Sequence, residues 1–586
     1  MDKSAPPKKW LIKASPQLSK ENPIGSKEGI PRALANLLPL RGVNTDDELM
    51  RFLHPTLDQL PNPDELPGIK EGSNLLAKAI INNFPIVIYG DYDADGITAT
   101  ALLSLFLRDL GVTSSSYLPD REGEGYGLHT KAIKKIHDDL SKNSPNKPLI
   151  LITVDCGISN KDEVAFAKEL GFQVIVTDHH HPPKALPEAN ILINPRLQIT
   201  NSPFQILAGV GVAFYLAAGL RMRLMERGVF SKKTPPNLKN YLDLVALGTI
   251  ADMVPLIGVN RIMVKAGLEI INKSPRPGIE ALLKYTREPQ GQIRSETIAF
   301  QLAPRINAAG RMGCPNRALD LLMSNSVTSA RHLSEIIDKT NDKRRQLTDL
   351  CYAQAKEKQH ENIKPDQSSL VLVFPEWRQG ILGLIAGRIA QDINRPVAVF
   401  AKTDNCTLKG SIRSIDGVDI ISVLNQCSAE LIQFGGHSAA AGLTIDQSQL
   451  DRFTEKFEEI ISLSMKEIYL EPVVHIDHEI NIEETMTKIF LDKYVLFEPF
   501  GVGNPEPIFS CPNTVIVTRA EQRGKNTLYY QIQENEKCFD GIGFGMGGLS
   551  ELLINKKIKL AFKISLNSFR GKQRWELRAE DIKLPA

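Results

Sequence analysis

The sequence predicts an α/β protein of several domains: a parallel-sheet domain, a long connecting helix, a second α/β domain and a small β-barrel. From Pro85 onward, short β-branched runs alternate with amphipathic segments, which is typical of parallel strands joined by helices. A second stretch of this kind begins at Ser369, and after Glu471 the chain changes to short strand-like runs separated by Gly, Asn and Pro. With 586 residues, 42% of them hydrophobic, the chain can form roughly three or four domains of about 100–200 residues.

The N-terminal part precedes this regular pattern. It is rich in Pro and polar groups, with short helical patterns at Ile30–Leu38 and Asp46–Phe52, and predicts an extension packed on a core or, alternatively, a partly disordered arm. Ala318–Asn362 is charged, with Leu and Ile at helical spacings, and predicts a connecting helix or a surface helix hairpin. The predicted domains are the N-terminal extension (1–70), the first α/β domain (71–315), the connecting helix (316–365), the second α/β domain (366–466) and the barrel (467–586).

The composition neither supports nor excludes a nucleic-acid partner. The formal charge is +2, so a surface for a polyanion must come from local clusters of Lys and Arg. The seven cysteines include no C-x-x-C pair, which argues against a disulfide framework and a thiolate zinc site. No apolar signal segment and no run of about 18 uncharged apolar residues occurs. We therefore expect a soluble, cytoplasmic protein with no membrane partner.

Polar clusters follow three predicted strands of the first α/β domain. The clearest strands are Ile86–Tyr89, Leu149–Val154 and Gln173–Thr177. The clusters that follow them are Asp91–Gly96, Asp155–Ser159 and Asp178–His181. Because open α/β sheets bind ligands outside the carboxyl ends of their strands, we expect these clusters to converge on one edge of the sheet.

The acidic residues after the first two strands each have two interpretations. Asp93 and Asp95 are two residues apart and precede a turn at Gly96, a spacing at which carboxylates can bind adjacent divalent cations, but a helix N-cap has the same pattern. Asp155 ends an apolar strand, where a carboxylate needs solvent, a hydrogen bond or a metal ion. A capping role is the alternative for Asp155.

The last two clusters add histidines and a fourth carboxylate. Asp178, His179 and His180 follow a β-branched run, and imidazole beside carboxylates suits Mn²⁺ or a similar ion, although a single histidine is more often structural. Asp252 interrupts an apolar helical stretch. A buried carboxylate there requires a partner, which is either a cation shared with the other clusters or a nearby arginine.

In their order and their positions at strand ends, these residues resemble the four motifs of the DHH phosphoesterase superfamily. Five further segments narrow the resemblance to its RecJ family of single-stranded-DNA-specific exonucleases, and the resemblance covers nearly the whole chain. The segments are Y-L-P-D-R-E-G-E-G-Y-G-L (Tyr117–Leu128), L-A-P-R-I-N-A-A-G-R-M (Leu302–Met312), G-S-I-R-S (Gly410–Ser414), F-G-G-H-S-A-A-A-G (Phe434–Gly442) and E-P-F-G-V-G-N-P-E-P-I-F (Glu498–Phe509). The resemblance implies a DHH domain, a DHHA1-like second domain and an OB-like barrel.

The resemblance also implies roles for individual residues around two divalent cations, Mn²⁺ or Mg²⁺. Asp155 would bridge the two ions, His180 would contact the scissile phosphate, and Asp178 would orient a histidine through a hydrogen bond. The implied metal ligands are Asp93, Asp95, Asp155, His179 and Asp252. The implied phosphate- and DNA-binding residues are Arg121, Asn307, Arg311, Ser411, Arg413 and His437.

Three positions depart from the family pattern. Tyr89 stands where many superfamily members have a histidine, so one ion would have one protein ligand fewer. Asp120 stands where related sequences tend to have asparagine, and a carboxylate there would repel a phosphate. Arg378 stands where a histidine is common, and the sequence assigns it no role.

The predicted barrel has the composition of a single-strand-binding domain. Residues 513–586 contain 13 Lys plus Arg against 8 Asp plus Glu. Five aromatic residues occur among them, which either stack on bases or form the barrel core: Tyr529, Tyr530, Phe539, Phe569 and Trp575.

The predicted function is hydrolysis of single-stranded DNA by a metal-dependent 5′→3′ exonuclease in recombination and repair. The polarity follows only from the resemblance, as do two further partners, a single-strand-binding protein and a helicase. One alternative is a DHH phosphodiesterase for short oligonucleotides or cyclic dinucleotides. Another is a catalytically inactive scaffold that binds single strands, which the concentration of carboxylates disfavours because they repel phosphate.

Overall fold

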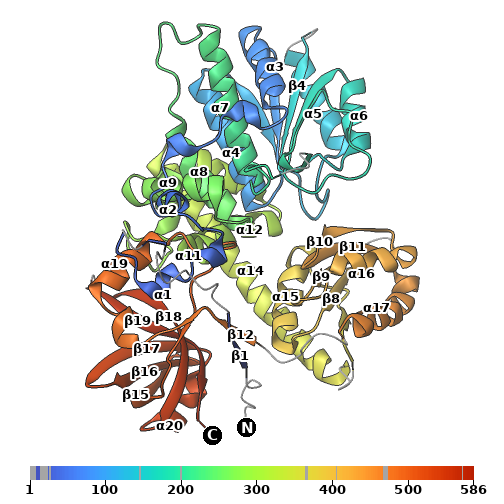
Figure 1. The fold of residues 1–586 in the computed structure, drawn as a ribbon. Coiled ribbons are helices and arrows are strands. Elements are labelled where there is room, and N and C mark those ends of the chain that lie inside the picture. The colour runs from blue at the N-terminus through green and yellow to red at the C-terminus, as the bar shows by residue number, and fades with distance from the viewer. Residues whose placement is uncertain are drawn as a thin grey trace.

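The computed structural model (Figure 1) has the predicted architecture, so the predicted fold class is confirmed. Among the residues that it describes, no helix combines the length and the apolar character that crossing a membrane requires. The described residues are 8–13, 24–25, 28–143, 147–197, 201–362, 367–403, 406–465, 473–569 and 572–585.

The first domain is built on a five-stranded parallel sheet with the order β3-β2-β4-β5-β6. Strands β2 and β4 have the predicted bounds, and β5 begins one residue earlier than predicted. Strand β3 has the sequence Ser-Ser-Ser-Tyr, which carries no β-branched signal. The strands are β2 (Ile86–Tyr89), β3 (Ser114–Tyr117), β4 (Leu149–Val154), β5 (Phe172–Thr177) and β6 (Ile191–Ile193).

Helices cover both faces of this sheet, which is why its central strands are continuously apolar. Ile86 and Ile88 pack in the core that includes α3 (Ile69–Ile81), α4 (Ala94–Asp109) and α7 (Gly209–Glu226). Figure 1 shows these helices beside the sheet. Val87 and Tyr89 point to the other face, where α5 (Thr130–Asn143) and α6 (Lys161–Glu169) pack. The chain reverses its direction of winding between β2 and β4, and ligands of such sheets bind at this switch point.

A group of helices and one long helix lead away from the sheet domain. The group consists of α8 (Leu242–Ala251), α9 (Gly258–Lys273), α10 (Pro277–Leu283), α11 (Ser295–Thr297), α12 (Ala303–Arg311) and α13 (Pro315–Met323). The predicted connecting helix is divided, because α13 ends before a Ser-Asn-Ser segment and α14 (Val327–Asn362) begins after it. At 36 residues, α14 is about 54 Å long and reaches the second domain.

The second α/β domain has a mixed five-stranded sheet with the order β10-β11-β9-β8-β7, in which only β7 and β8 are parallel. The Gly-rich segment found in the sequence forms the hairpin of β10 and β11. The strands are β7 (Leu370–Val373), β8 (Val397–Lys402), β9 (Thr407–Arg413), β10 (Gln433–His437) and β11 (Ala440–Asp446), and the helices are α15 (Leu382–Ile393), α16 (Ile420–Gln426) and α17 (Leu450–Met465).

The C-terminal strands close into a five-stranded barrel, because β18 pairs with both β15 and β19 while β15-β16-β17-β19 form a continuous row. This closure is that of an OB-like barrel. Short elements precede it: β12 (Val473–Ile476), β13 (His478–Glu479), α18 (Ile482–Thr485), α19 (Lys488–Leu496) and β14 (Phe509–Ser510). The remaining elements are β15 (Val515–Arg523), β16 (Thr527–Glu534), β17 (Lys537–Phe544), α20 (Ser550–Leu553), β18 (Lys557–Phe569) and β19 (Lys572–Lys583).

The N-terminal extension packs on this barrel, as far as its residues are described. Its helices α1 (Arg32–Ala35) and α2 (Asp46–Leu53) share one hydrophobic core with α19 and the barrel strands. Strand β1 (Lys9–Ile12) pairs in parallel with β12. The two ends of the chain therefore form one structural unit.

Candidate metal centre and nucleic-acid interface

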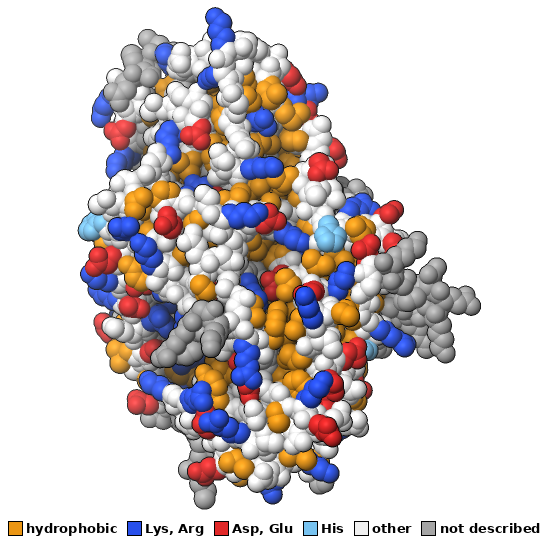
Figure 2. All heavy atoms as spheres, turned by 90° about the vertical axis from the view of Figure 1, so that its left-hand side faces the viewer, with side chains coloured by type: hydrophobic (Ala, Val, Ile, Leu, Met, Phe, Trp, Pro, Cys, Tyr) orange, Lys and Arg blue, Asp and Glu red, His pale blue; other side chains and the backbone are white. Residues whose placement is uncertain are grey.

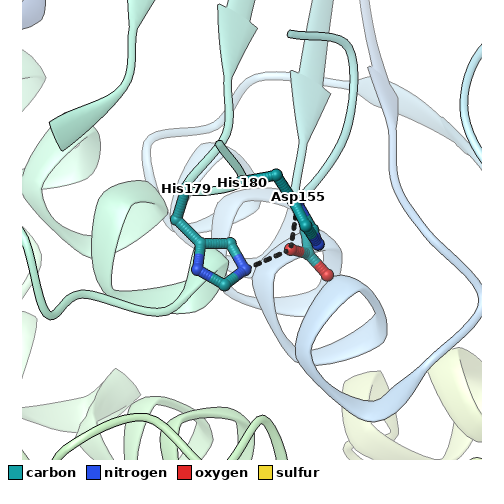
Figure 3. A group of neighbouring side chains, drawn as sticks. All are labelled: Asp155, His179 and His180. Atoms are coloured by element: carbon teal, nitrogen blue, oxygen red, sulfur yellow. Dashed lines mark ion pairs between the residues drawn. The ribbon is translucent and has the colours of Figure 1, made fainter. Parts of the chain in front are cut away.

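The four predicted motifs meet at the carboxyl edge of the parallel sheet. The Nε2 atom of His179, after β5, lies 3.1 Å from Oδ1 of Asp155, which follows β4. The same nitrogen lies 3.8 Å from Asp95 Oδ2 at the start of α4 and 3.6 Å from Asp252 Oδ2 at the end of α8. Figure 3 shows His179 facing Asp155, with His180 beside them. In the described part of the chain Asp252 Oδ2 faces the ring of His179 and forms no ion pair with an arginine, so the geometry favours a shared cation as its partner.

Two separate groups of possible ligand atoms, joined by a third group, suit a site for two ions. Asp95, His179 and Asp252 form one group, and Asp91, Asp93 and Asp155 form the other. In each group the ligand atoms lie within 4.8 Å of one another. Asp155 also groups with His179 and His180, so that its carboxylate lies between the two clusters.

Several polar atoms in this cluster are buried without a hydrogen-bond partner in the described part of the chain. They are Asp91 Oδ1, Asp155 Oδ1, Asp252 Oδ2 and both ring nitrogens of His179. Buried polar atoms nearly always have partners, so unpartnered acceptors that converge on one point indicate a bound cation. These oxygen and imidazole donors fit Mn²⁺ or Mg²⁺.

Asp91 was not among the predicted site residues. It follows β2, its side chain is buried, and it completes the second group of ligand atoms. The signal was present in the sequence, because Asp91 alternates with Asp93 and Asp95 in D-Y-D-A-D.

Local backbone structure positions the carboxylates. Asp93 is the N-cap of α4 and accepts hydrogen bonds from the backbone N–H groups of Asp95 and Gly96, so the capping interpretation also applies to it. Asp95 accepts two hydrogen bonds, of 2.6 and 2.9 Å, from the N-terminus of α7. Asp155 has a left-handed backbone with φ of 62°. A Cβ atom added to Gly209 would lie 2.6 Å from the Cβ atom of Asp155. The glycine at the start of α7 is therefore required for the close approach.

The electrostatics of the cluster favour a divalent cation. Burial, and after it the neighbouring carboxylates, raises the pKa of Asp91, Asp155 and Asp252 well above the ordinary range of aspartate. The same two causes raise the pKa of Asp95 to about 7. Burial and the adjacent His180 lower the pKa of His179 to about 3, so its imidazole is neutral and available as a ligand.

Asp178 holds the second histidine. Its Oδ1 accepts hydrogen bonds from the backbone N–H groups of His179 and His180 and lies 2.7 Å from Nδ1 of His180. Burial alone would raise the pKa of Asp178, but these interactions keep it below the ordinary value. Desolvation likewise opposes the charge on His180, but Asp178 raises its pKa to about 9. The hydroxyl group of Tyr126, another residue that the sequence did not single out, lies 3.1 Å from the same Nδ1.

The predicted phosphate-binding residues surround this edge from both α/β domains. Asn307 on α12 accepts a hydrogen bond from the backbone N–H of Ala94, at the N-terminus of α4. Arg311 donates to the backbone oxygen of Gly380 in the second domain. Burial, followed by the charges of Arg121 and Arg413, lowers the pKa of Arg311 to about 9, which shows that three cations are gathered here.

The second domain contributes the remaining predicted residues. Ser411 and Arg413 alternate on β9 and share one face, and Arg413 donates to the Ser411 hydroxyl. Burial and the neighbouring Arg413, His180 and His181 lower the pKa of His437, which ends β10. On the face that Figure 2 shows, Lys and Arg are interspersed with acidic and apolar side chains.

The three departures from the family pattern have structural explanations. Tyr89 points away from the cluster and donates to the backbone oxygen of Gly127. Asp120 accepts hydrogen bonds from the backbone N–H groups of Glu122 and Gly123, so its carboxylate stabilises its own loop. Arg378 forms two hydrogen bonds with Glu122, of 2.9 and 2.6 Å, and so links the second domain to this loop.

All seven cysteines are free, as expected for a chain without a disulfide framework.

Comparisons with known proteins agree with this architecture. Residues 85–249 match the DHH family, N-terminal domain; residues 366–463 match the DHHA1 domain; and residues 476–581 match the RecJ OB domain. The single-stranded-DNA-specific exonuclease RecJ of Haemophilus influenzae is 37% identical over 577 residues, which cover 96% of this chain and 98% of that protein. The crystal structure of RecJ from Thermus thermophilus in complex with Mn²⁺ has a TM-score of 0.81 and 28% identity, over 99% of this chain and 80% of that one.

The structure of the same Thermus protein with Mg²⁺ has a TM-score of 0.75 and 27% identity, over 99% of this chain and 79% of that one. The likeness thus extends over the sheet domain, the long helix, the second domain and the barrel. This chain belongs to the RecJ family of the DHH phosphoesterase superfamily.

Proposed function

We propose that this chain is a metal-dependent exonuclease that hydrolyses single-stranded DNA from the 5′ end and releases nucleotides, in recombination and repair. The observation that carries the proposal is the convergence of buried, unpartnered carboxylate and imidazole atoms at one sheet edge, rimmed by arginines from two domains. The names of the RecJ relatives supply the substrate class.

Two divalent cations, Mn²⁺ or Mg²⁺, would share the cluster. Asp95, His179 and Asp252 would hold one ion, Asp91 and Asp93 the other, and Asp155 would contact both. When bound, such a pair activates a water molecule and neutralises the charge of the phosphodiester.

The surrounding side chains bind and orient the substrate. His180 would donate a hydrogen bond to a phosphate oxygen, while Asp178 and Tyr126 set the plane of its ring. Arg121, Arg311 and Arg413 offset the charge of the backbone phosphates, for which guanidinium groups are suited. Asn307, Ser411 and His437 add neutral hydrogen-bonding groups at the same rim.

The wider setting follows from the family. We propose a cytoplasmic location, consistent with the free cysteines. A single-strand-binding protein and a helicase are the further partners that the resemblance implies, and they stay predictions.

The proposal is tested with single-stranded DNA labelled at its 5′ or 3′ end, with Mg²⁺, Mn²⁺ or a chelator. Asp155→Asn is the informative variant, because asparagine tolerates the left-handed backbone at this position and only the charge is lost. We expect hydrolysis to cease while DNA binding continues. Asp138→Asn, at an exposed carboxylate on α5, is the matched control and should hydrolyse like wild type.

Turnover by Asp155→Asn, or by wild type in chelator, would overturn the assignment of the metal centre. A preference for dinucleotides over long single strands would favour the alternative oligonucleotide phosphodiesterase. Early release of label from the 3′ end would overturn the proposed polarity.

A further inference from the structure

Three cavities adjoin one another between the barrel, the central helices and α14. A cavity of about 480 Å³ on the barrel shares Tyr529, Asn567 and Glu576 with a cavity of about 790 Å³ between the barrel, the central helices and α14. That cavity in turn shares Arg294, Phe300 and other residues with a third hollow of about 350 Å³. Met253, which directly follows the candidate ligand Asp252, lines the third hollow.

Three exposed apolar side chains line this third hollow, and we call them the apolar shelf. They are Phe300, 74% exposed, Met253, 72% exposed, and Val502, 44% exposed. Large apolar side chains with this exposure are unusual together on a folded protein unless they contact a ligand or partner. The shelf is thus a candidate contact surface between the central helices and the loop before the barrel.

The backbone presents two of these residues in uncommon conformations. Phe300 lies in a π-helical turn, Ile298–Leu302, between α11 and α12, and such turns occur preferentially at functional sites. Met253 has a left-handed backbone with φ of 60°, which costs a residue with a Cβ atom on the order of 1–3 kcal/mol.

Hydrogen bonds hold the shelf in place. The backbone N–H of Leu256 donates to the backbone oxygen of Val502 at 2.7 Å, and Ser295 donates to Phe500 at 2.6 Å. These contacts keep the segment after Asp252, the π-helical turn and the loop before the barrel together.

The charges around the shelf are balanced. Arg294 pairs with Glu498, and Arg578 pairs with Glu296 and Glu506. A site of paired charges around apolar side chains suits an uncharged flat group and not a phosphate.

The adjoining larger cavity is lined by more arginines than glutamates. Its wall on α14 carries Arg344, whose Nε atom is buried without a hydrogen-bond partner in the described part of the chain. Arg287, Arg305 and Arg345 line the same cavity. An unpartnered guanidinium N–H beside further arginines suits an anionic phosphate oxygen.

We propose that the apolar shelf stacks a base of the single-stranded DNA between the barrel and the central helices, while Arg344 binds a backbone phosphate of the same strand. Bases have the flat apolar faces that such a shelf accepts, whatever their sequence. Phe300 would therefore be a positioning residue, and the inference rests on the proposed function for the identity of the ligand.

The test measures binding and therefore does not depend on turnover. Fluorescence anisotropy with single-stranded oligonucleotides, without divalent metal, gives the affinity of wild type, Phe300→Ala and Phe300→Trp. One abasic residue is moved stepwise along the oligonucleotide. Ile489→Ala, at a residue 70% exposed on α19 and outside the lining of these cavities, is the control.

We expect wild type to lose about 5- to 100-fold in affinity when the abasic residue reaches one particular position. Phe300→Ala should bind intact DNA correspondingly more weakly and be insensitive to the abasic residue, and Phe300→Trp should restore both properties. A flat abasic scan in wild type, or wild-type affinity in Phe300→Ala, would overturn the shelf. Because these outcomes need no hydrolysis, they are separate from a failure of the metal-centre proposal, which only the nuclease assay reveals.

Discussion

Arg261 on α9 connects three segments that are far apart in the chain, and its loss should release the barrel. The side chain is almost fully buried and stacks over the ring of Phe52, 3.9 Å from its centroid. It donates to the backbone oxygen of Phe52 in the N-terminal extension. Its other hydrogen bonds reach the backbone oxygens of Leu496, Phe497, Glu498 and Pro499.

The expected loss of stability on replacing Arg261 follows from these contacts. Each hydrogen bond from a charged donor contributes about 1.5–3 kcal/mol, but taking the guanidinium out of water opposes their sum by several kcal/mol. Burial accordingly lowers the pKa of Arg261 to about 9. Replacement by methionine keeps the apolar volume but leaves five carbonyl oxygens without this donor, and we expect a loss of about 3–5 kcal/mol in local stability.

Hydrogen exchange is the suitable assay, because a protein of several domains does not unfold in one step. In Arg261→Met the protected amides of α2 and α19 should exchange about 100- to 5000-fold faster, while those of β2 and β4 keep their rates. Arg331→Met, at an exposed position on α14, should change exchange little. Unchanged exchange in α2 and α19, or equal acceleration in the sheet domain, would refute the reasoning.

Three further predictions concern charges. Reversing the charge of either member of the Glu122–Arg378 pair should raise the KM for single-stranded DNA, and the rise should be only about fivefold because the pair is partly exposed. Exchanging both residues should restore the wild-type KM, and a failure to do so would show that the pair does not position the loop. Burial and then Arg261 lower the pKa of Lys265 to about 8 from the ordinary 10.5. Between these pH values the unfolded chain binds one more proton at Lys265 than the folded chain does. In denaturant titrations the stability of wild type relative to Lys265→Met should therefore rise with pH, and a stability difference that does not change with pH would contradict this. Arg344→Gln should reduce the salt dependence of single-strand binding by about 0.7 in logarithmic slope; an unchanged slope would remove Arg344 from the phosphate path.

The metal centre could be predicted in large part from the sequence, because the relevant order is local. A β-branched run followed by an acidic cluster identifies a strand and its carboxyl end, as at Ile86–Tyr89 and Asp91–Gly96. Parallel strands of one sheet place these ends along a common edge, so convergence follows from topology alone. The residue types then indicate a hard divalent cation.

Other features could not be predicted because they depend on contacts between distant parts of the chain. Tyr126 reaches His180 only when the loop after β3 folds across the edge, and Arg378 meets Glu122 only when α14 has placed the second domain. The N-terminal extension likewise packs on the barrel, and no local pattern of residues shows which core receives it.

The amino-acid order is thus sufficient for the three central strands of the parallel sheet, their acidic ends and the basic barrel, since each depends on neighbours within about ten residues. The tertiary structure decides which carboxylates lie together at the sheet edge, that Asp91 is one of them, and that both chain ends form one unit held by Arg261. Burial and pairing across hundreds of residues arise only when the packed domains remove side chains from water, and no local pattern encodes that.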